Sequence, residues 1–397
     1  MRDLTKLIDR TNAGYSARYP QALLDRMMFV GDPLADAAVA ALHERNYDRA
    51  ADKLSAVRAL AAEGDGAARA FIEAVAAPPD WLDRSAIAAG QKAMLGFVGL
   101  SRISLMHSLF AGGVFARATL VTRATGRLGA NPATRISETG AFIAAILQPG
   151  GLEPGALGFE TTLRVRLLHS SIRAWLRRMP DFSQGFVGEP IDQTMLAMTL
   201  SLFSYLNLRS FARLGVRFSD GENEALQHLW RYVGRLLGVD DTLLARSLRQ
   251  ERELWSALVA HQAFAGEWGR QLLEESVRTV AALTQQRGDM QAFVRSLFML
   301  LSGSEWFGTH DDARPDARLR ALRAANTAQS LWRRWAPGQA GRMATAGLEA
   351  FEKSVHLARA HRFEVKIETS EENARAEAAL KAVGAAVRER FVGLTTT

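Results

Sequence analysis

The feature that most limits the fold of this chain is its long succession of helical patterns, with almost no pattern typical of a β-strand. Apolar residues recur three and four positions apart along most of the 397 residues, which places them on one face of an α-helix. Val, Ile and Thr in alternation with polar residues, the pattern of a half-buried strand, occur only over 363–369. The sequence therefore predicts an all-α protein.

Short breakers separate the predicted helices, and no Pro- or Ser-rich linker divides the chain. Asp32 is expected as an N-cap and Pro33 as the first residue of a helix. We expect one large helical domain over 1–397, with peripheral helices at both ends. The other predicted helices run over about 48–75, 84–98, 101–127, 132–147, 158–179, 190–213, 219–237, 240–263, 266–284, 288–303, 316–335, 338–359 and 371–391.

Composition and motifs exclude several kinds of chemistry. The hydrophobic fraction is 48% and the charged fraction 23%, values of a folded globular protein rather than a disordered chain. The chain has no cysteine, which excludes disulfides, thiolate-bound zinc, cysteine-held iron–sulfur clusters and a thiolate-ligated haem. The motifs of zinc proteases, P-loops and serine hydrolases are absent as well. Metal or redox chemistry must therefore rest on histidine, arginine, carboxylates, hydroxyls or a non-covalently bound cofactor.

The charge distribution favours neither a nucleic-acid partner nor a membrane-spanning segment. The net charge is +7, but the arginines are spread along the chain instead of forming a basic stripe, so no nucleic-acid partner is expected. The longest weakly polar stretch, 194–208, is shorter than the ~20 residues that a spanning helix needs. Residues 1–10 alternate charges and lack both the apolar core of a signal peptide and a twin-arginine pair, which predicts a cytoplasmic location.

His169 is the first candidate for a functional side chain. On the helix expected over 158–179 it shares a face with Val165 and Ile172, and Arg173 lies one turn further on. A neutral imidazole on an apolar helix face can ligate a metal or a haem iron. The same pattern fits a buried histidine that hydrogen-bonds to a backbone carbonyl, so the residues alone leave both interpretations open.

The helix expected over 132–147 carries the second candidate group. Arg135 and Thr139 lie one turn apart on one face, and Glu138 lies one step round the helix. Gly140 in the middle of this helix costs about 1 kcal/mol relative to alanine, which suggests that a neighbouring helix or a flat ligand approaches the backbone there. A surface arginine beside a packed threonine is the alternative interpretation.

Four stretches in order along the chain together resemble the latex clearing protein (rubber oxygenase) family, over about residues 25–310. That family shares its catalytic domain with the fungal ER-bound oxygenase of mycophenolic acid biosynthesis. The four stretches are 30–39, the pair Arg135 and Thr139 followed by His169 and Arg173, the segment 189–193 leading into a helix with Thr199, and 228–239.

The resemblance implies a globin-like helical core around a non-covalent haem b. It implies that His169 is the iron ligand and that Arg173 supports it through a haem propionate, since guanidinium pairs well with a carboxylate. It also implies that Arg135 and Thr139 line the haem pocket, and Thr199 is a further match to that pocket.

One position departs from the pattern of the family. Some members carry a lysine immediately before the pocket threonine, where its amine can cap the iron. Here that position is Glu138, and a carboxylate cannot copy a neutral amine ligand. Glu138 would therefore act as a base beside bound oxygen or face away from it.

By this resemblance the chain is expected to be a haem-dependent, dioxygenase-type oxygenase. It would use O₂ to oxidise or cleave a C=C bond of an apolar, isoprenoid-like or lipid substrate, with Arg135, Thr139 and Glu138 acting on the bound oxygen. A haem-binding sensor or carrier without turnover, and a helical protein that kept the fold without the cofactor, are the alternatives.

The segment from about 311 to 397 matches none of these motifs and is expected to form a C-terminal helical extension. Its Trp332, Trp335 and Phe351 occupy helical positions typical of a buried core. The sequence does not indicate an oligomeric state.

Overall fold

The computed structural model describes most of the chain between residues 14 and 356. The predicted strand over 363–369 and the predicted helix over 266–284 lie outside the described residues, as do nearly all of 371–391. Within the helix at 132–147 the side chains of residues 132–136 are also not described. The described residues are 14–47, 52–112, 115–125, 132–179, 186–263, 317–336, 338–352 and 354–356, with isolated positions over 293–301 and at 374 and 378.

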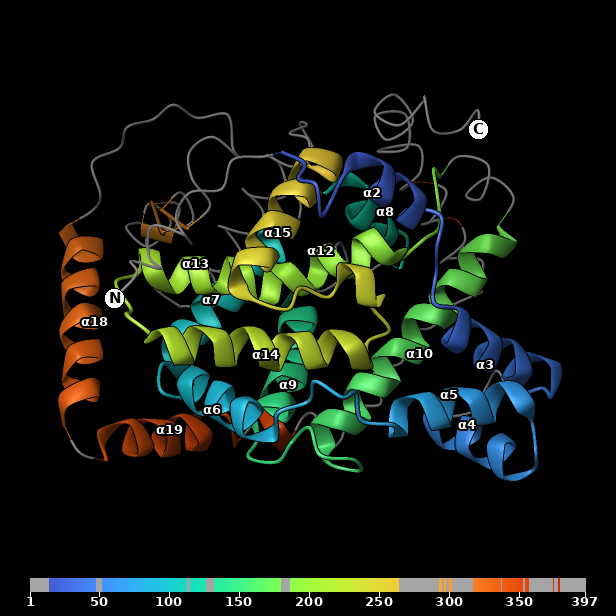
Figure 1. Ribbon diagram of the computed structural model, residues 1–397, viewed down its shortest axis with the longest axis horizontal. Coiled ribbons are helices and arrows are strands. Elements are labelled where there is room, and N and C mark those ends of the chain that lie inside the picture. Colours follow the sequence, from blue (N-terminus) through green and yellow to red (C-terminus); the bar gives the residue numbers. More distant parts are fainter. Residues whose placement is uncertain are drawn as a thin grey trace.

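The regular elements of these described residues are helices, which confirms the predicted all-α class (Figure 1). They are α2 (Gln21–Met27), α3 (Pro33–Glu44), α4 (Lys53–Ala62), α5 (Gly66–Ala76), α6 (Arg84–Leu95), α7 (Val98–Ala111), α8 (Ala116–Ala124), α9 (Pro132–Leu147), α10 (Leu157–Arg178), α12 (Gln193–Phe203), α13 (Tyr205–Arg213), α14 (Asp220–Leu236), the 3₁₀ helix η2 (Asp241–Leu243), α15 (Leu248–Gln262), α18 (Ala317–Trp335) and α19 (Gln339–Ala350).

Most predicted helices coincide with observed ones, but some of the long predictions are each two helices. The helix predicted over 48–75 is α4 and α5, because Gly64 adopts a left-handed φ of 96° and Asp65 starts the next helix by accepting from the Ala68 amide. The helix predicted over 190–213 is α12 and α13, which meet at Ser204 with a non-helical φ of −96° and ψ of −86°. No glycine, proline or other helix-breaking pattern in the sequence predicts the break at Ser204.

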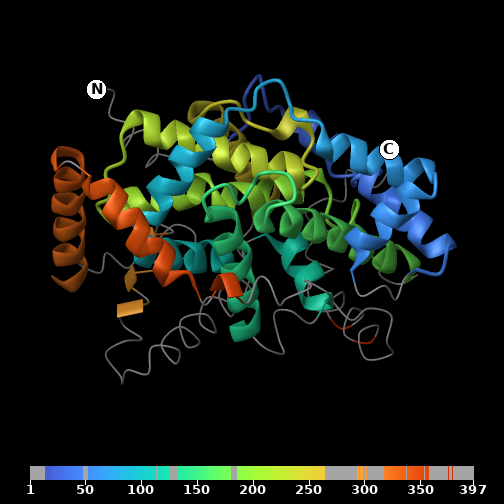
Figure 2. The same ribbon diagram turned by 90° about the horizontal axis from the view of Figure 1, so that it is seen from below.

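The helices that bear on function occupy the middle of the molecule. Helices α6, α9, α12 and α14 lie centrally, α3 to α5 lie at one end and α18 lies at the other, in both views (Figures 1 and 2). Helix α10 packs against α9 and α14 on one side and against α3 and α4 on the other. It therefore links the central helices to the α3–α5 end. None of the described helices is both long and apolar enough to cross a bilayer.

The large apolar residues predicted for the C-terminal helices differ in burial. Phe351 is buried in the core, as predicted. Trp332 and Trp335 are 55% and 81% exposed, so the prediction of a buried position is wrong for both. Helical periodicity identifies a face but does not say whether that face meets the core or the solvent.

The crossing of α6 and α14 is close because one helix carries glycine there. Gly90 of α6 is buried, and a Cβ at this position would lie 2.6 Å from the carbonyl oxygen of Ala225 and 3.2 Å from the Cβ of Leu229. A backbone carbonyl oxygen and a Cβ atom cannot move aside by side-chain rotation, so the helices would have to shift to make room.

Gly90→Ala is therefore expected to lower the free energy of unfolding by about 1–3 kcal/mol, as overpacked helix contacts do. Gly99→Ala, in the first turn of α7, is the matched control, because an added Cβ there meets no atom within 4 Å. The control should be neutral or stabilise by up to about 1 kcal/mol. Urea unfolding of both variants measures the difference, and equal effects would contradict the close α6–α14 contact.

Candidate functional site

Helix α10 carries two distinct faces. Val165, Leu168, His169 and Ile172 lie on one face and line a cavity. The face beside it is polar and meets α3. The sequence pattern placed His169 and Arg173 on a common face, but the structure turns them toward different neighbours.

The cavity has a volume of about 270 Å³ and a mostly apolar lining. Its wall is made by α8, α9, α10, α12 and α14, together with Gly112 after α7, Ile191 before α12, and the residues that directly follow α8 and α14. Its described lining residues are Gly112, Ala118, Thr119, Val121, Thr122, Thr125, Glu138, Thr139, Phe142, Val165, Leu168, His169, Ile172, Ile191, Met195, Leu196, Met198, Thr199, Leu200, Leu202, Phe203, Trp230 and Leu237. Such a concave apolar space with a few polar groups is the usual form of a small-molecule site.

Four of the six residues singled out by the sequence meet in this cavity. His169 comes from α10, Glu138 and Thr139 from α9, and Thr199 from α12. The side chain of Arg135 is not among the described ones, so its predicted place in the pocket stays a prediction. A Cβ added to Gly140 would meet no atom within 4 Å, so no neighbouring helix of the described structure packs against it.

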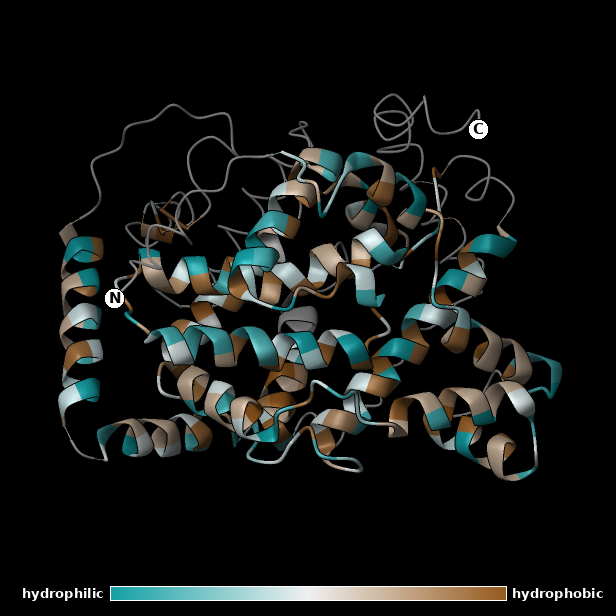
Figure 3. Cartoon of the chain, in the orientation of Figure 1, coloured by the Kyte–Doolittle hydropathy of each residue, from teal (hydrophilic) through white to brown (hydrophobic). Residues whose placement is uncertain are grey.

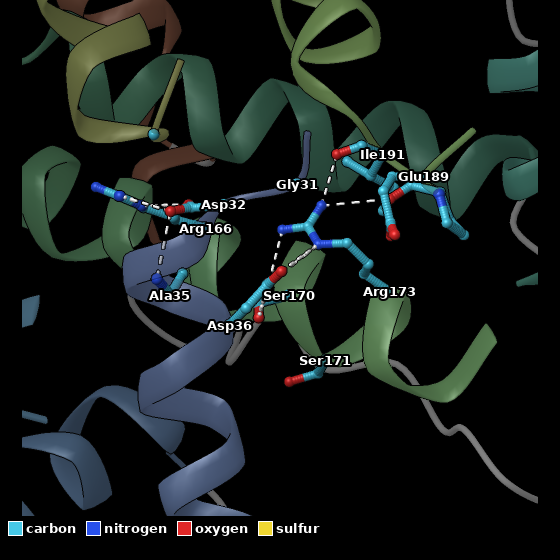
Figure 4. Close-up of polar contacts among 12 residues, drawn as sticks. Gly31, Asp32, Ala35, Asp36, Arg166, Ser170, Ser171, Arg173, Glu189 and Ile191 are labelled. Atoms are coloured by element: carbon cyan, nitrogen blue, oxygen red, sulfur yellow. Dashed lines mark hydrogen bonds and ion pairs between the residues drawn. The ribbon is translucent and has the colours of Figure 1, made fainter. Parts of the chain in front are cut away.

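Arg173, the sixth residue, is not among those that line the cavity. Its guanidinium is fully buried and pairs with Asp36 of α3, with Nη2 2.9 Å from Oδ1 and Nε 3.0 Å from both carboxylate oxygens (Figure 4). Its Nη1 donates to the carbonyl oxygen of Ile191 at 2.6 Å and to that of Pro190 at 3.3 Å. These contacts support a positioning role, and they do not support the predicted pairing with a haem propionate.

The Arg173 contacts fix the cavity wall as well as the helix. Ile191 lines the cavity and has a φ of 55°, a left-handed conformation that is uncommon for a β-branched residue. The hydrogen bond from Arg173 holds the carbonyl of this residue, and Asp36 holds Arg173 in turn. The ion pair therefore ties α3, α10 and the strained wall residue together.

The segment 189–193, one of the four stretches that suggested the family, is a structural junction. Asp192 caps α12 by accepting from the Thr194 amide at 2.7 Å, and it also pairs with the buried Arg117 at 2.6 Å. Gln193 donates to the carbonyls of Gly31 and Gly238, at 2.7 Å and 3.0 Å. The segment therefore joins the start of α12 to two other parts of the chain.

Sequence reasoning missed the threonines of α8. Thr119, Thr122 and Thr125 all line the cavity. The hydroxyls of Thr122 and Thr125 donate to carbonyl oxygens of their own helix, which makes these polar residues compatible with an apolar wall. Their spacing of three along one helix was the signal that could have identified them.

A buried carboxyl lies next to the break between α12 and α13. Glu251 of α15 is buried, and desolvation raises its pKa to about 8, with the charge of Glu224 acting in the same direction. The nearby Ser204 hydroxyl and Tyr205 amide oppose this shift. Burial thus favours the protonated form of Glu251 in the folded protein.

The fold and the cavity define an all-α protein built around an apolar cavity that a histidine and a carboxylate help to line. Residues 86–351 match the family model described as ER-bound oxygenase mpaB/B'/Rubber oxygenase, catalytic domain, and the chain belongs to this family. The matched range includes α18 and α19.

Two individual proteins are similar to the chain. The rubber oxygenase of Streptomyces sp. (strain K30) is 24% identical over 246 residues, which cover 59% of this chain and 60% of that protein. The solved structure of latex clearing protein in its closed state superposes with a TM-score of 0.54 at 20% identity, covering 90% of this chain and 91% of the other. The second similarity concerns the fold.

Arg173→Met is expected to destabilise the protein by about 3–5 kcal/mol, because it leaves a carboxylate and two carbonyls without their buried partner. Arg177→Met is the matched control, since Arg177 also pairs with Asp36, at 3.3 Å, but is 42% exposed. The control should cost about 1 kcal/mol or less. Chemical unfolding measures the free energy of unfolding of each variant, and a double-mutant cycle with Asp36→Asn gives the coupling of each arginine to Asp36. Equal losses of stability in Arg173→Met and Arg177→Met would contradict the structural role of Arg173.

Glu251→Gln is expected to make stability less dependent on pH. Because the folded pKa of about 8 exceeds the ordinary value of 4.5, the folded protein keeps a proton that the unfolded chain releases between these values. The free energy of unfolding of the wild type therefore falls as pH rises through this window, by at most about 1.4 kcal/mol per pH unit.

Glutamine does not titrate, so the variant should lose the part of the pH dependence that comes from Glu251. Its free energy of unfolding should therefore rise relative to that of the wild type as the pH goes from 5 to 8. Glu253→Gln on the same helix, at a more exposed position paired with Arg249, should leave the pH profile unchanged. Melting curves at several pH values test this, and parallel profiles of wild type and Glu251→Gln would refute it.

Proposed function

We propose that this chain is a haem b-dependent oxygenase that uses O₂ to oxidise or cleave a C=C bond of an apolar, isoprenoid-like or lipid substrate. The observation that carries the proposal is the position of His169 on the wall of an apolar cavity that also contains Glu138 and Thr139. Membership of an oxygenase family supports it.

The residues of the cavity fit a haem. Haem would bring its own iron and ring nitrogens, so one imidazole would be enough to hold the group from the protein side. His169 supplies that imidazole, and apolar residues such as Leu168, Ile172 and Phe142 supply surfaces for a flat, largely apolar ring. No cysteine is available to tether the group, so packing and one axial ligand would retain it.

Glu138 and Thr139 are the polar residues that we assign to the reaction. When bound, the haem would supply the O₂-activating chemistry. The Thr139 hydroxyl can donate a hydrogen bond to an oxygen atom within the cavity, and the Glu138 carboxylate can hold or transfer a proton. Arg135 is proposed as a third polar group of this set, from the family resemblance.

The remaining lining restricts what can enter. Met195, Leu200, Leu202 and Trp230 present apolar surface to the cavity and would exclude water from a reacting double bond. An apolar substrate gains from this desolvation, whereas a charged one would lose its hydration without compensation. The rubber oxygenase to which the chain is similar bears a name that indicates a polyisoprene substrate, and we propose the same chemical class here.

His169→Ala is expected to abolish the Soret band of the purified protein, because the variant removes the axial ligand proposed for the iron. His43→Ala is the matched control, since His43 is an exposed residue of α3 away from the cavity lining, and it should keep the band. Absorption spectra of the oxidised and reduced proteins, with haemin titration of each variant, provide the measurement.

Oxygen uptake with a polyisoprene or terpenoid substrate separates an oxygenase from a haem carrier. The wild type should consume O₂ with cleavage of the substrate, and His169→Ala should not. A wild-type protein that binds no haem would overturn the proposed cofactor. A protein that binds haem but consumes no O₂ with these substrates would overturn the proposed oxygenase.

A further inference from the structure

The inward face of α18 is apolar at Leu319, which packs with Leu214 and Leu301, and polar over its second half. The Asn326 amide donates to the carbonyl of Leu214 at 2.7 Å, the Thr327 hydroxyl donates to the carbonyl of Gly215 at 2.9 Å, and the Ser330 hydroxyl accepts from the Arg217 amide at 3.0 Å. These bonds attach α18 to the turn between α13 and α14. Over this second half, polar side chains take the place of the apolar residues that a surface helix normally presents to the core.

An arginine completes the inward face. Arg333 is buried, pairs with Glu222 of α14 at 2.5 Å and stacks on Phe97 at 5.0 Å and Phe218 at 5.6 Å. Its charge is therefore neutralised within the protein and is not available to a partner.

The outward face of α18 is a continuous apolar stripe. In Figure 3 hydrophobic and hydrophilic residues alternate along the helix, as in an amphipathic helix. Trp335 is 81% exposed, Trp332 55% and Leu331 47%. Small exposed residues continue the stripe toward the start of the helix at Ala321, Ala324 and Ala328. Exposed apolar surface of this extent on one helix indicates an interaction site.

The charge beside the stripe is of one sign. Arg320 and Arg334 are exposed and lie along one edge of the stripe, four turns apart. Helix α18 contains five arginines and no acidic residue. The outward surface therefore combines exposed tryptophan with the two exposed arginines Arg320 and Arg334.

We propose that the outward face of α18 binds the surface of an anionic lipid membrane. Tryptophan and arginine side by side on an amphipathic helix are typical of a helix that lies in the headgroup region, where arginine meets lipid phosphates. In both views α18 forms one edge of the described structure, so a flat surface can reach it (Figures 1 and 2). The contact requires neither the cofactor nor turnover.

A second copy of the chain fits this face less well. Two copies meeting through their α18 stripes would bring arginines close to arginines, with no carboxylate on the helix to offset them. A single convex helix also lacks a groove in which an identical helix could insert.

The experiment is flotation of the purified full-length chain with vesicles. Wild type should bind vesicles of equal parts phosphatidylserine and phosphatidylcholine, and bind phosphatidylcholine vesicles much more weakly. Arg320→Gln with Arg334→Gln should weaken binding to the anionic vesicles by about fivefold for each arginine. Trp332→Ser with Trp335→Ser should weaken it by about tenfold.

Ala328→Glu adds one acidic residue to the middle of the stripe without disturbing the helix, and it should weaken binding in the same way. Phe29→Ser is the matched control, because Phe29 is 48% exposed but lies just after α2, and it should leave binding unchanged. Circular dichroism confirms that each variant is folded.

No binding of the wild type to anionic vesicles would overturn the proposal, and so would binding that the α18 variants leave unchanged. A concentration-dependent dimer that Trp332→Ser with Trp335→Ser abolishes, without vesicle binding, would assign the face to a second copy. Loss of vesicle binding in the α18 variants, with the Phe29 control intact, supports the lipid surface.

Discussion

The ion pair between the buried Arg173 and the partly buried Asp36 is the interaction on which the arrangement of the cavity depends. A guanidinium removed from water is costly unless its donors meet acceptors. Here the Asp36 carboxylate accepts from Nε, two backbone carbonyls accept from Nη1, and Nη2 lies 2.9 Å from the same carboxylate. The acceptors belong to α3 and to the segment before α12, while the donor belongs to α10. If α3, α10 or the segment before α12 moved, the buried guanidinium of Arg173 would lose a carboxylate or carbonyl acceptor. The pair thereby fixes the helix that carries His169 relative to the wall residue Ile191.

Helix α10 is held in place by its polar face, which explains why its other face can present a single histidine to an apolar cavity. The polar face of the helix is held by Asp32 through Arg166, with Nε to Oδ2 at 2.6 Å, as well as by Asp36 through Arg173. The adjoining face is then free to be apolar apart from His169, because it does not need polar contacts to hold the helix in place. Such support fixes the orientation of a functional side chain before any bound group arrives.

The sequence was sufficient for the fold class, for most helices and for four residues of the cavity, but not for the role of Arg173. Helix periodicity and caps are local, so α9 and α10 could be located to within one or two residues. His169 and Arg173 are one turn apart, and only the packing of α3 decides that they face different neighbours. The break at Ser204 and the exposure of Trp335 were missed for the same reason, because each depends on what packs against the helix rather than on the helix itself. The spacing of three between Thr119, Thr122 and Thr125 can be seen in the sequence, but nothing else in the sequence indicates that these threonines face a cavity.

The abundance of arginine over lysine has a physical explanation in these interior sites. Arg117 donates to the carbonyl of Val187 while it pairs with Asp192, and Arg173 serves two carbonyls and a carboxylate at once. A planar guanidinium with donors in several fixed directions can meet such a set, whereas the compact ammonium of lysine cannot reach acceptors that lie on opposite sides. Helix α18 contains arginines of both kinds: Arg333 is buried and pairs with Glu222, whereas its neighbour Arg334 is exposed. An ion pair inside the protein takes up one charge of each sign, so the interior pairs leave the net charge of +7 unchanged. They do remove particular arginines from the surface, and on α18 this leaves Arg320 and Arg334 exposed while Arg333 is buried against Glu222.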